Sequence, residues 1–430
     1  MADNENQRIM NKNENNMDGN NTSSRIPKLR FPGFTGEWEE KNLGKVCDSI
    51  LVGFPFKGQD ITDDTTGHPI LRAYSIGEGI IRHGKDYDKY YPNDSTTLER
   101  YKVKDGDIVI SMDGSVGRNI AMVSKEEENY LLIQRVARLR IKDYPKQLIY
   151  QQVISKRFKD YATGEKVGAV IAHISQKQIE SFPVLIPPTL AEQQKIASCL
   201  SELDNLITAQ GQKVDALKEK KKGLMQQLFP QQGEMVPRLR FPGFEGEWDY
   251  VNGNELFMSI SNKNHNSDLP ILALTQDQGA VPREMINYNV VVSDKSVAGY
   301  KVVEVDDFII SLRSFQGGIE YSRYKGLCSP AYIVLRKKSK DMSSDFYRIY
   351  FKSFMYIQEL NRNLEGIRDG KMISYQQFSE IKLPKPSPVE QQKIAECLSA
   401  LDETIADEAE KLDALKAHKK GLMQQLFPQP

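Results

Sequence analysis

The chain carries two phrases that each occur twice, and this duplication constrains its fold more than any other feature. Residues 192–230, EQQKIASCLSELDNLITAQGQKVDALKEKKKGLMQQLFP, recur at residues 390–428 as EQQKIAECLSALDETIADEAEKLDALKAHKKGLMQQLFP, at a constant offset (390 − 192 = 198). A shorter phrase at residues 27–38, PKLRFPGFTGEW, returns at residues 237–248 as PRLRFPGFEGEW. The two repeated phrases, here called the frame, enclose insert 1 (residues 39–183) and insert 2 (residues 249–384), which share only scattered positions. The chain is therefore a tandem of two units with one frame and two different inserts.

The longer phrase has the periodicity of a long amphipathic helix with a coiled-coil seam, because apolar residues recur in steps of four and three. In the first copy the two seam series are Ile196, Leu203, Gln210, Leu217 and Leu224, and Leu200, Ile207, Val214, Lys221 and Leu228. In the second copy they are Ile394, Leu401, Glu408, Leu415 and Leu422, and Leu398, Ile405, Leu412, Lys419 and Leu426. Proline clusters precede both helices, and Pro230 and Pro428 follow them, so helix breakers set their length.

We expect these two helices to pair antiparallel about a pseudo-twofold axis. Polar residues interrupt the seam at matching places in the two copies, Gln210 with Glu408 and Lys221 with Lys419. A buried polar pair in such a seam fixes its register. About 35 to 40 helical residues at 1.5 Å each make a rod of roughly 50 to 60 Å.

Positions outside the seam are also nearly identical in the two copies. They include Lys222, Gln226 and Gln227 in the first copy, and Lys420, Gln424 and Gln425 in the second. Helices that merely close two domain cores would explain the periodicity but not this identity, because core packing tolerates many apolar substitutions. Both helices are therefore expected to present one surface to copies of one partner.

The inserts are predicted to be mixed α and β. Strands are expected over residues 106–112, 131–141, 307–312 and 331–335, and helices over residues 147–162 and 345–363. Both inserts contain a similar strand and loop, DIVISMDGSVG at residues 107–117 and DFIISLRSFQGG at residues 307–318. The strand is kept while the loop chemistry changes, with Asp113 at the place of Arg313.

Composition excludes several classes of protein. The 430 residues carry no net charge, so nucleic-acid binding must come from local patches. The four cysteines lack C-x-x-C spacing and are expected to be reduced thiols in a cytoplasmic protein. We expect neither a membrane span nor a signal peptide, and an Asn-rich disordered tail over residues 1–26.

The order of variable insert and EQQKIA-type helix, repeated twice, resembles the specificity subunit of type I restriction-modification systems. The proline-rich phrases LIPPTLAEQQKIA (residues 185–197) and LPKPSPVEQQKIA (residues 383–395) carry the resemblance, which covers the chain after the tail. It implies an α+β fold with target recognition domains at residues 27–188 and 233–386, separated by antiparallel coiled-coil spacer helices at residues 189–232 and 387–430.

The resemblance also implies a function. Each recognition domain would read one half of an asymmetric, split site in double-stranded DNA. The helices would fix the gap between the half-sites and dock two modification (methyltransferase) subunits. Restriction subunits, which are ATP-dependent translocases and endonucleases, would join through the complex. The chain itself would be a non-catalytic subunit in DNA methylation and restriction.

The residues agree with this assignment. A methyltransferase would need a glycine-rich cofactor loop and an (N/D)-P-P-(Y/F) phrase, and a nucleotide-driven motor would need G-x-x-x-x-G-K-(S/T); the sequence contains none of these. The five histidines form no metal-binding spacing, so we expect no metal, no cofactor and no catalytic residue. Two other interpretations stay open: a self-contained DNA-modifying enzyme without a recognisable motif, and a coiled-coil scaffold protein without a DNA function.

Candidate base-reading residues are Arg, Lys, Gln and Asp side chains in loops, because these groups match base edges in the major groove. They are Lys57, Arg72, Asp113 and Arg118 in insert 1, and Arg283, Arg313, Gln316 and Arg323 in insert 2. A solvated surface charge is the ordinary role of any such residue. Arg313 and Gln316 are the strongest candidates, since their glycine-flanked loop follows a strand that both inserts keep. The basic run at residues 336–338 is expected to meet phosphate, or only water.

Overall fold

A computed structural model describes residues 25–164, 173–266, 268–286, 297–364 and 373–428. The chain forms two compact units: unit 1 contains the residues up to Ala209 and those from Asp413 onward, and unit 2 contains Gln210–Leu412. Two helices of 39 residues each, α6 (Leu190–Leu228) and α13 (Pro388–Leu426), contribute a portion to each unit. The long helices predicted from the repeat are thus confirmed.

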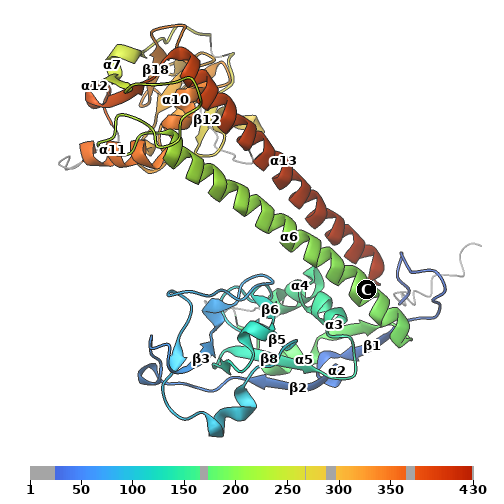
Figure 1. Ribbon diagram of the computed structural model, residues 1–430. Helices are drawn as coiled ribbons and strands as arrows, with labels where there is room; N and C mark the ends of the chain where they lie inside the picture. Colours follow the sequence, from blue (N-terminus) through green and yellow to red (C-terminus); the bar gives the residue numbers. More distant parts are fainter. Residues whose placement is uncertain (1–24, 165–172, 267, 287–296, 365–372, 429–430) are drawn as a thin grey trace, which may run out of the picture. The chain divides into compact units, whose positions relative to one another are not determined.

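Insert 1 is built around an antiparallel four-stranded sheet (Figure 1). Its strand order is β2 (Cys47–Val52), β8 (Val136–Ile141), β5 (Ile108–Ser111) and β6 (Ile120–Met122). Smaller sheets pair β1 (Glu39–Asn42) with β9 (Pro183–Ile186), and β3 (His68–Leu71) with β4 (Tyr90–Tyr91) and β7 (Leu131–Leu132). The α-helices are α2 (Leu43–Val46), α3 (Lys146–Val153), α4 (Lys156–Gly164) and α5 (Gln176–Ser181). Short 3₁₀ turns are η1 (Gly58–Asp60), η2 (Ala73–Ser75), η3 (Thr96–Tyr101) and η4 (Lys125–Glu127).

Insert 2 repeats this plan with other residues. Its four-stranded sheet has the order β11 (Phe257–Ile260), β18 (Ile333–Lys337), β15 (Phe308–Ile310) and β16 (Glu320–Tyr321). Paired strands are β10 (Asp249–Asn252) with β19 (Lys382–Lys385), β12 (Leu272–Thr275) with β13 (Gly279–Pro282), and β14 (Lys301–Val303) with β17 (Gly326–Cys328). The helices are α7 (Gly253–Leu256), α9 (Ser314–Gly317), α10 (Ser344–Tyr350), α11 (Phe354–Leu364) and α12 (Tyr375–Glu380), with the 3₁₀ turn η5 (Arg283–Met285).

The two four-stranded sheets correspond strand for strand, and each packs against two consecutive helices. In unit 1 apolar residues of α3 and α4 share one buried core with β5 and β8, which contains Ile149, Phe158 and Ile108. In unit 2 the corresponding core is rich in aromatic rings, with Phe257, Phe308 and Phe351 in mutual edge or tilted contact. Different side chains therefore fill the same architecture, as the mixed α and β prediction expected.

The repeated phrases of the frame bind each other through a buried ion pair. In unit 1 the Arg30 guanidinium donates two hydrogen bonds of 2.8 Å to the carboxylate of Glu192. In unit 2 Arg240 and Glu390 make the same two bonds at the same distances. Both carboxylates are almost fully buried, where a paired charge is tolerated and an unpaired one is costly. This mutual fit explains why RFPGF and EQQKIA recur together.

The ends of the long helices complete each unit. In unit 1 the Trp38 ring meets Phe427 edge-on at 5.8 Å, and the Leu29 N–H donates to the Gln425 carbonyl. In unit 2 Trp248 shares a core with Leu228 and Phe229, and the Leu239 N–H donates to the Gln227 carbonyl. Unit 1 is thus closed by the end of the second helix copy, and unit 2 by the same phrase of the first copy.

Within each unit the two helices run antiparallel. In unit 1 Asp204 lies opposite Lys419, and in unit 2 Asp402 lies opposite Lys221. Every predicted seam position on both helices is buried or half-buried. The Gln210 amide donates at 2.7 Å to the Glu408 carboxylate, which confirms the predicted polar pair in the seam.

Four local predictions were wrong in detail. The run 131–141 is two strands rather than one, because the chain turns at Arg135, whose φ is 69°. The predicted helices over 147–162 and 345–363 are each two helices, because Ser155 and Ser353 cap a new first turn by accepting from the N–H groups of Phe158 and Tyr356. The second long helix begins at Pro388 rather than after it, at the position where a helix tolerates proline.

The four cysteines are free thiols, and burial raises the pKa of Cys47 and of Cys328 to about 12. Among the residues that the structure describes, no helix has the length and apolar character needed to cross a membrane.

Candidate nucleic-acid interface

The loops that follow the equivalent strands β5 and β15 hold four of the eight sequence-predicted residues. Asp113 and Arg118 lie between β5 and β6, and Arg313 and Gln316 lie between β15 and β16. Equivalent strand pairs, β5–β6 and β15–β16, thus present the two loops, whose side chains differ. This arrangement suits two surfaces that recognise different partners through one scaffold.

The loop of insert 1 is held by an ionic cluster around Asp113. The Asp113 carboxylate lies 2.6 Å from Nδ1 of His173 and 3.3 Å from a guanidinium nitrogen of Arg135. Asp113 and His173 also form an isolated backbone bridge. The carboxylate therefore already has two cationic or donor partners, so its ability to accept from a cytosine amino group depends on competition with them.

Arg135 is a residue that the sequence did not identify. It is more than half exposed, it contacts Asp113, and it has a positive φ of 69°, which is strained for a residue other than glycine. The only sequence signal is the polar pair Gln134–Arg135 inside a run that otherwise has a strand pattern. An exposed guanidinium beside the predicted loop extends the candidate surface of insert 1.

Arg118 is placed differently from Asp113. It lines a hollow of about 660 Å³ in unit 1, whose other walls include Asp204 on α6, and Lys416 and Lys419 on α13. The lining also includes Lys159 and Glu78, so four cationic side chains face two carboxylates, and this excess of positive charge fits a phosphate better than a base edge. Arg118 therefore has the surroundings of a backbone contact.

The loop of insert 2 is built to expose Arg313 and Gln316. The backbone N–H of Ser311 donates to the Ser314 hydroxyl at 2.8 Å, which closes the turn into α9. Gly318 has a φ of 82°, and a Cβ there would lie 2.0 Å from the Phe351 carbonyl oxygen, so the position requires glycine. Arg313 and Gln316 are exposed on this rigid turn.

An ion pair between half-buried Lys352 and buried Glu320 supports the same loop. The Lys352 ammonium donates to the Gly317 carbonyl at 2.8 Å and to the Glu320 carboxylate at 2.6 Å. Burial raises the pKa of Glu320, and the Lys352 charge opposes that rise. The second carboxylate oxygen of Glu320 is buried without a hydrogen-bond partner in the described part of the chain. Lys352 thus fixes the turn without using Arg313 or Gln316.

The other four predicted residues lie apart from these loops. Lys57 is exposed before η1, Arg72 is half-buried between β3 and η2, and Arg283 is half-buried at the start of η5. Arg323 follows β16. Because Tyr321 pairs with Phe308 at the start of β15, Arg323 lies at one end of the β15–β16 pair and the Arg313 loop lies at the other end. The structure therefore does not bring Arg323 and Arg313 into one reading loop.

The basic run at residues 336–338 is not wholly available to phosphate. Arg336 makes two hydrogen bonds, of 2.7 and 2.6 Å, to the buried carboxylate of Asp307. Arg140 makes the equivalent pair with Asp107 in insert 1. These arginines join the central strands of the two sheets, while the Arg336 side chain stays 37% exposed, so contact of the basic run with phosphate or water stays a prediction.

One cluster among the described residues could in principle ligate a metal. Side-chain ligand atoms of His83, Glu126 and Glu127 lie within 4.8 Å of one another. His83 Nε2 lies 3.0 Å from Glu127, and Nδ1 lies 3.4 Å from Asp88. Burial lowers the His83 pKa, but the hydrogen bond to Glu127 and the nearby carboxylates outweigh it and raise the pKa overall. His83 already has Glu127 and Asp88 as partners, so the cluster has the geometry of a hydrogen-bonded network of side chains.

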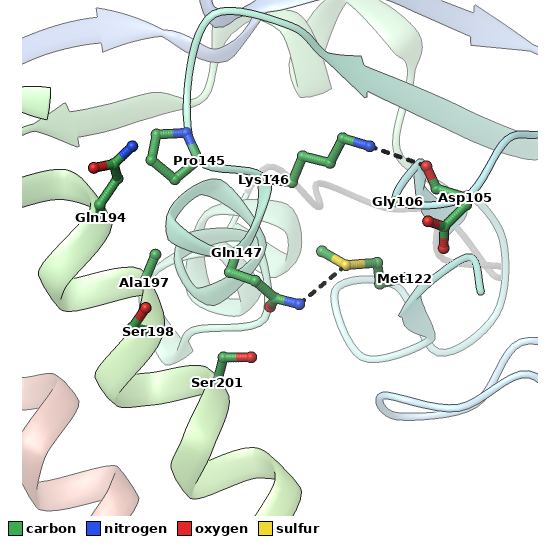
Figure 2. A pocket seen from close by; sticks show the side chains of 10 residues that line it. All are labelled: Asp105, Gly106, Met122, Pro145, Lys146, Gln147, Gln194, Ala197, Ser198 and Ser201. Atoms are coloured by element: carbon green, nitrogen blue, oxygen red, sulfur yellow. Dashed lines mark hydrogen bonds between the residues drawn. The ribbon is translucent and has the colours of Figure 1, made fainter. Parts of the chain in front are cut away.

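A second hollow, of about 470 Å³, lies where α3 meets α6 (Figure 2). Lys146 donates to the Asp105 carbonyl at 3.0 Å, and the Gln147 amide donates to the Met122 sulfur at 3.2 Å. The α6 side chains of Ser198 and Ser201 border it. Among the residues that line this hollow, no nucleophile is hydrogen-bonded to a base, so the hollow lacks the features of a catalytic site. It is a gap in the packing of insert 1 against α6.

Comparison with known proteins gives a family match over most of the chain. The family described as "Type I restriction modification DNA specificity domain" matches residues 35–219 and residues 246–417. The putative type I restriction enzyme MjaX specificity subunit of Methanocaldococcus jannaschii is 26% identical over 414 residues, covering 91% of this chain and 93% of that protein. The type I restriction enzyme MjaVIII specificity subunit of the same organism is 24% identical over 419 residues, covering 93% of each protein.

Solved structures show the same fold. The crystal structure of a type I restriction-modification S subunit from M. genitalium matches with a TM-score of 0.55 at 17% identity, covering 94% of this chain and 100% of that one. A chain from a study of complex assembly and conformational transition of the type I R-M system matches with a TM-score of 0.50 at 15% identity, covering 92% and 98%.

Proposed function

The chain belongs to the family of specificity subunits of type I restriction-modification systems, and we propose that it reads a split DNA site, one half with each of its two recognition domains. The observation that carries this proposal is the duplicated strand pair with two different loops. Asp113 and Arg135 occupy the loop region of insert 1, while Arg313 and Gln316 occupy that of insert 2. Different donors and acceptors on one scaffold would select different bases, so the site is asymmetric.

Arg313 and Gln316 are the proposed base-reading residues of the second domain. An exposed guanidinium can fork onto O6 and N7 of guanine, and a glutamine amide can pair with adenine. The turn that holds them is closed by Ser314 and supported by Lys352, so little ordering remains to be done on binding. Lys57, Arg72, Asp113, Arg283 and Arg323 stay candidates for further contacts, and Arg118 is proposed as a phosphate contact.

The two helices are proposed to dock two modification subunits. The side chains of Lys222, Gln226 and Gln227 are exposed on α6, and their counterparts Lys420, Gln424 and Gln425 are exposed on α13. Because these surfaces have the same residues, two copies of one partner can bind equivalently. Restriction subunits would then join through the complex, and this chain would contribute recognition without catalysis.

The same helices are proposed to set the gap between the half-sites. Both are continuous over 39 residues, and the seam pair of Gln210 and Glu408 fixes their register. A long helix with a fixed register is a stiff spacer, so one gap length should be preferred.

The proposal is tested by expressing the chain with its modification subunits and sequencing the methylated genome. We expect one bipartite motif with two unlike halves and one gap length. The purified chain alone should transfer no methyl group to DNA. Methyl transfer by this chain without partners would favour a self-contained enzyme, and a complex with no sequence-dependent DNA binding would favour a scaffold.

A further inference from the structure

Two equivalent aspartates on the long helices each join three parts of a unit. Asp204 on α6 and Asp402 on α13 stand at the same place in the repeat (402 − 204 = 198). Each binds a seam lysine of the antiparallel helix, and each lies against a polar side chain from the first helix that packs on the recognition sheet. We call these two groups the aspartate nodes.

The node of unit 1 consists of Asp204, Lys419 and Gln151. One carboxylate oxygen of Asp204 accepts from the Lys419 ammonium, and the other accepts from the Gln151 amide at 2.6 Å. Gln151 belongs to α3 and is 0% exposed, so its amide has a fixed direction. Two different elements therefore converge on one carboxylate of α6.

In each node the insert contributes one polar side chain, which we call the arm: Gln151 in unit 1 and Arg348 in unit 2. The node of unit 2 otherwise has the same arrangement. Asp402 accepts from the Lys221 ammonium, and the Arg348 guanidinium of α10 lies 4.0 Å from its second oxygen. Arg348 also donates to the Ser399 hydroxyl, one turn earlier on α13, at 3.0 Å. The aspartate and the lysine are thus kept in both units, and only the arm from the insert changes from glutamine to arginine.

The nodes explain why lysines stand in the helix seam. An ammonium among leucines is unfavourable unless a carboxylate meets it, and each node supplies that carboxylate from the facing helix. A pair of carboxylate and ammonium would satisfy this need without any third group. The arm from the insert therefore has another consequence, which is to bond the recognition domain to the helix pair.

The arm lies on the element that also holds the recognition sheet. On α3, Ile149 and Val153 share a buried core with Ile108 of β5, the strand that leads into the Asp113 loop. On α10, Phe346 and Tyr347 share a core with Phe308 of β15, the strand that leads into the Arg313 loop. A rotation of the sheet on the helices would have to break the Gln151–Asp204 hydrogen bond in unit 1, and in unit 2 the Arg348–Ser399 hydrogen bond with the adjacent 4.0 Å ion pair to Asp402.

We propose that Asp204 and Asp402 are positioning residues that fix the angle of each recognition domain on the helix pair and thereby set how strictly the protein selects one gap length. This inference rests on the proposed function. It assigns to the nodes no part in base selection, because neither aspartate belongs to an insert loop.

The experiment uses the full chain in complex with its modification subunits. Methylation is measured on a library of DNA sites that carry both correct half-sites, with the gap varied from two base pairs shorter to two longer, and on a second library with single wrong bases at the correct gap. Asp204→Ala and Asp402→Ala are compared with Asp215→Ala, which removes an exposed aspartate from α6 outside either node.

We expect each node variant to lower discrimination between the correct gap and its neighbours by about tenfold, the scale of one lost hydrogen bond to a charged group. Discrimination against wrong bases should stay within twofold of the wild type, and Asp215→Ala should match the wild type in both libraries. Unchanged gap discrimination in an assembled complex overturns the proposal, and so does an equal loss against wrong gaps and wrong bases, which would indicate general loosening.

Two further variants keep the test decisive if an aspartate variant does not fold. Gln151→Ala and Arg348→Ala remove the arm and leave each aspartate paired with its lysine, so they should relax the gap without disturbing the seam. Arg348→Ala also removes an exposed ion pair with Asp345 within α10, so Asp345→Ala is its control. Normal gap discrimination in both arm variants overturns the proposal. A wild-type complex that methylates without any bipartite motif would instead refute the proposed function itself.

Discussion

A half-chain comprising residues 235–430 is expected to form a homodimer that replaces the missing half. Unit 2 of the full chain is completed by the end of α6, where Leu228 and Phe229 pack beside Trp248. The half-chain lacks that segment. It does carry the same phrase, KKGLMQQLFP, at the end of α13, and there Leu426 and Phe427 can dock on the Trp248 of a second copy.

The free energy lost when the end of α6 is absent decides whether the half-chain can fold as a monomer or must dimerise. Val214, Leu228 and Phe229 are 4%, 2% and 1% exposed in the full chain, so all three side chains are essentially buried. Burying one such side chain contributes about 1.5 to 3 kcal/mol, so the three together are worth roughly 5 to 9 kcal/mol. Domains as a whole are stable by only about 5 to 15 kcal/mol, so the monomeric half-chain should not remain folded.

Light scattering on a sizing column should give twice the half-chain mass, and circular dichroism should show long helices. With modification subunits, methylome sequencing should return a palindrome of the half-site read by insert 2, because the dimer has twofold symmetry. The variant Leu426→Asp in the half-chain should abolish both dimer and helicity. A stably folded monomer, or an asymmetric methylated site, would refute the reasoning.

Three further outcomes are expected. Arg313→Ala should lower discrimination at one base of one half-site by roughly 1 to 3 kcal/mol, whereas a uniform loss with a smaller salt slope would make Arg313 a phosphate contact. Hydrogen bonds from Gln210, then from lysines, lower the Glu408 pKa from 4.5 to about 2. The contribution of Glu408 to the stability of the fold is therefore full above pH 4.5 and is lost as the pH falls towards 2. In Glu408→Gln the melting temperature should fall less steeply over that pH range. One heptad added to each long helix, between the Gln210–Glu408 and Lys221–Asp402 contacts, lengthens the helix pair by about 10 Å. The preferred gap between the half-sites should then lengthen by roughly three base pairs. An unchanged gap would mean that the helices do not set it.

The frame could be predicted from the sequence because its signals are local or repeated. Heptad steps identify the helices whatever surrounds them, and the polar seam residue Gln210 with its counterpart Glu408 predicts an antiparallel register. The near identity of the two copies removes ambiguity, since each phrase can be checked against the other. These parts depend on spacing along the chain, which a sequence displays directly.

The recognition surface could be predicted only in outline. The strand before each loop is visible, but the partners of its side chains come from far along the chain: His173 for Asp113, and Lys352 for the Gly317 carbonyl. The turn at Arg135 was missed because its one signal, the polar pair Gln134–Arg135 inside a strand pattern, does not reveal a positive φ. Contacts of this kind are set by tertiary packing, which local propensity does not report.

The distribution of contacts suggests why such a chain can change its target without losing its architecture. The repeated phrases contact each other directly, because Arg30 binds Glu192 and Trp38 meets Phe427. Insert 1 contacts the frame through α3, where the Gln151 amide donates to the Asp204 carboxylate of α6 at 2.6 Å and Leu148 shares a core with Leu200. An insert that supplies one such helix can therefore satisfy the frame, and its loops are then free to differ.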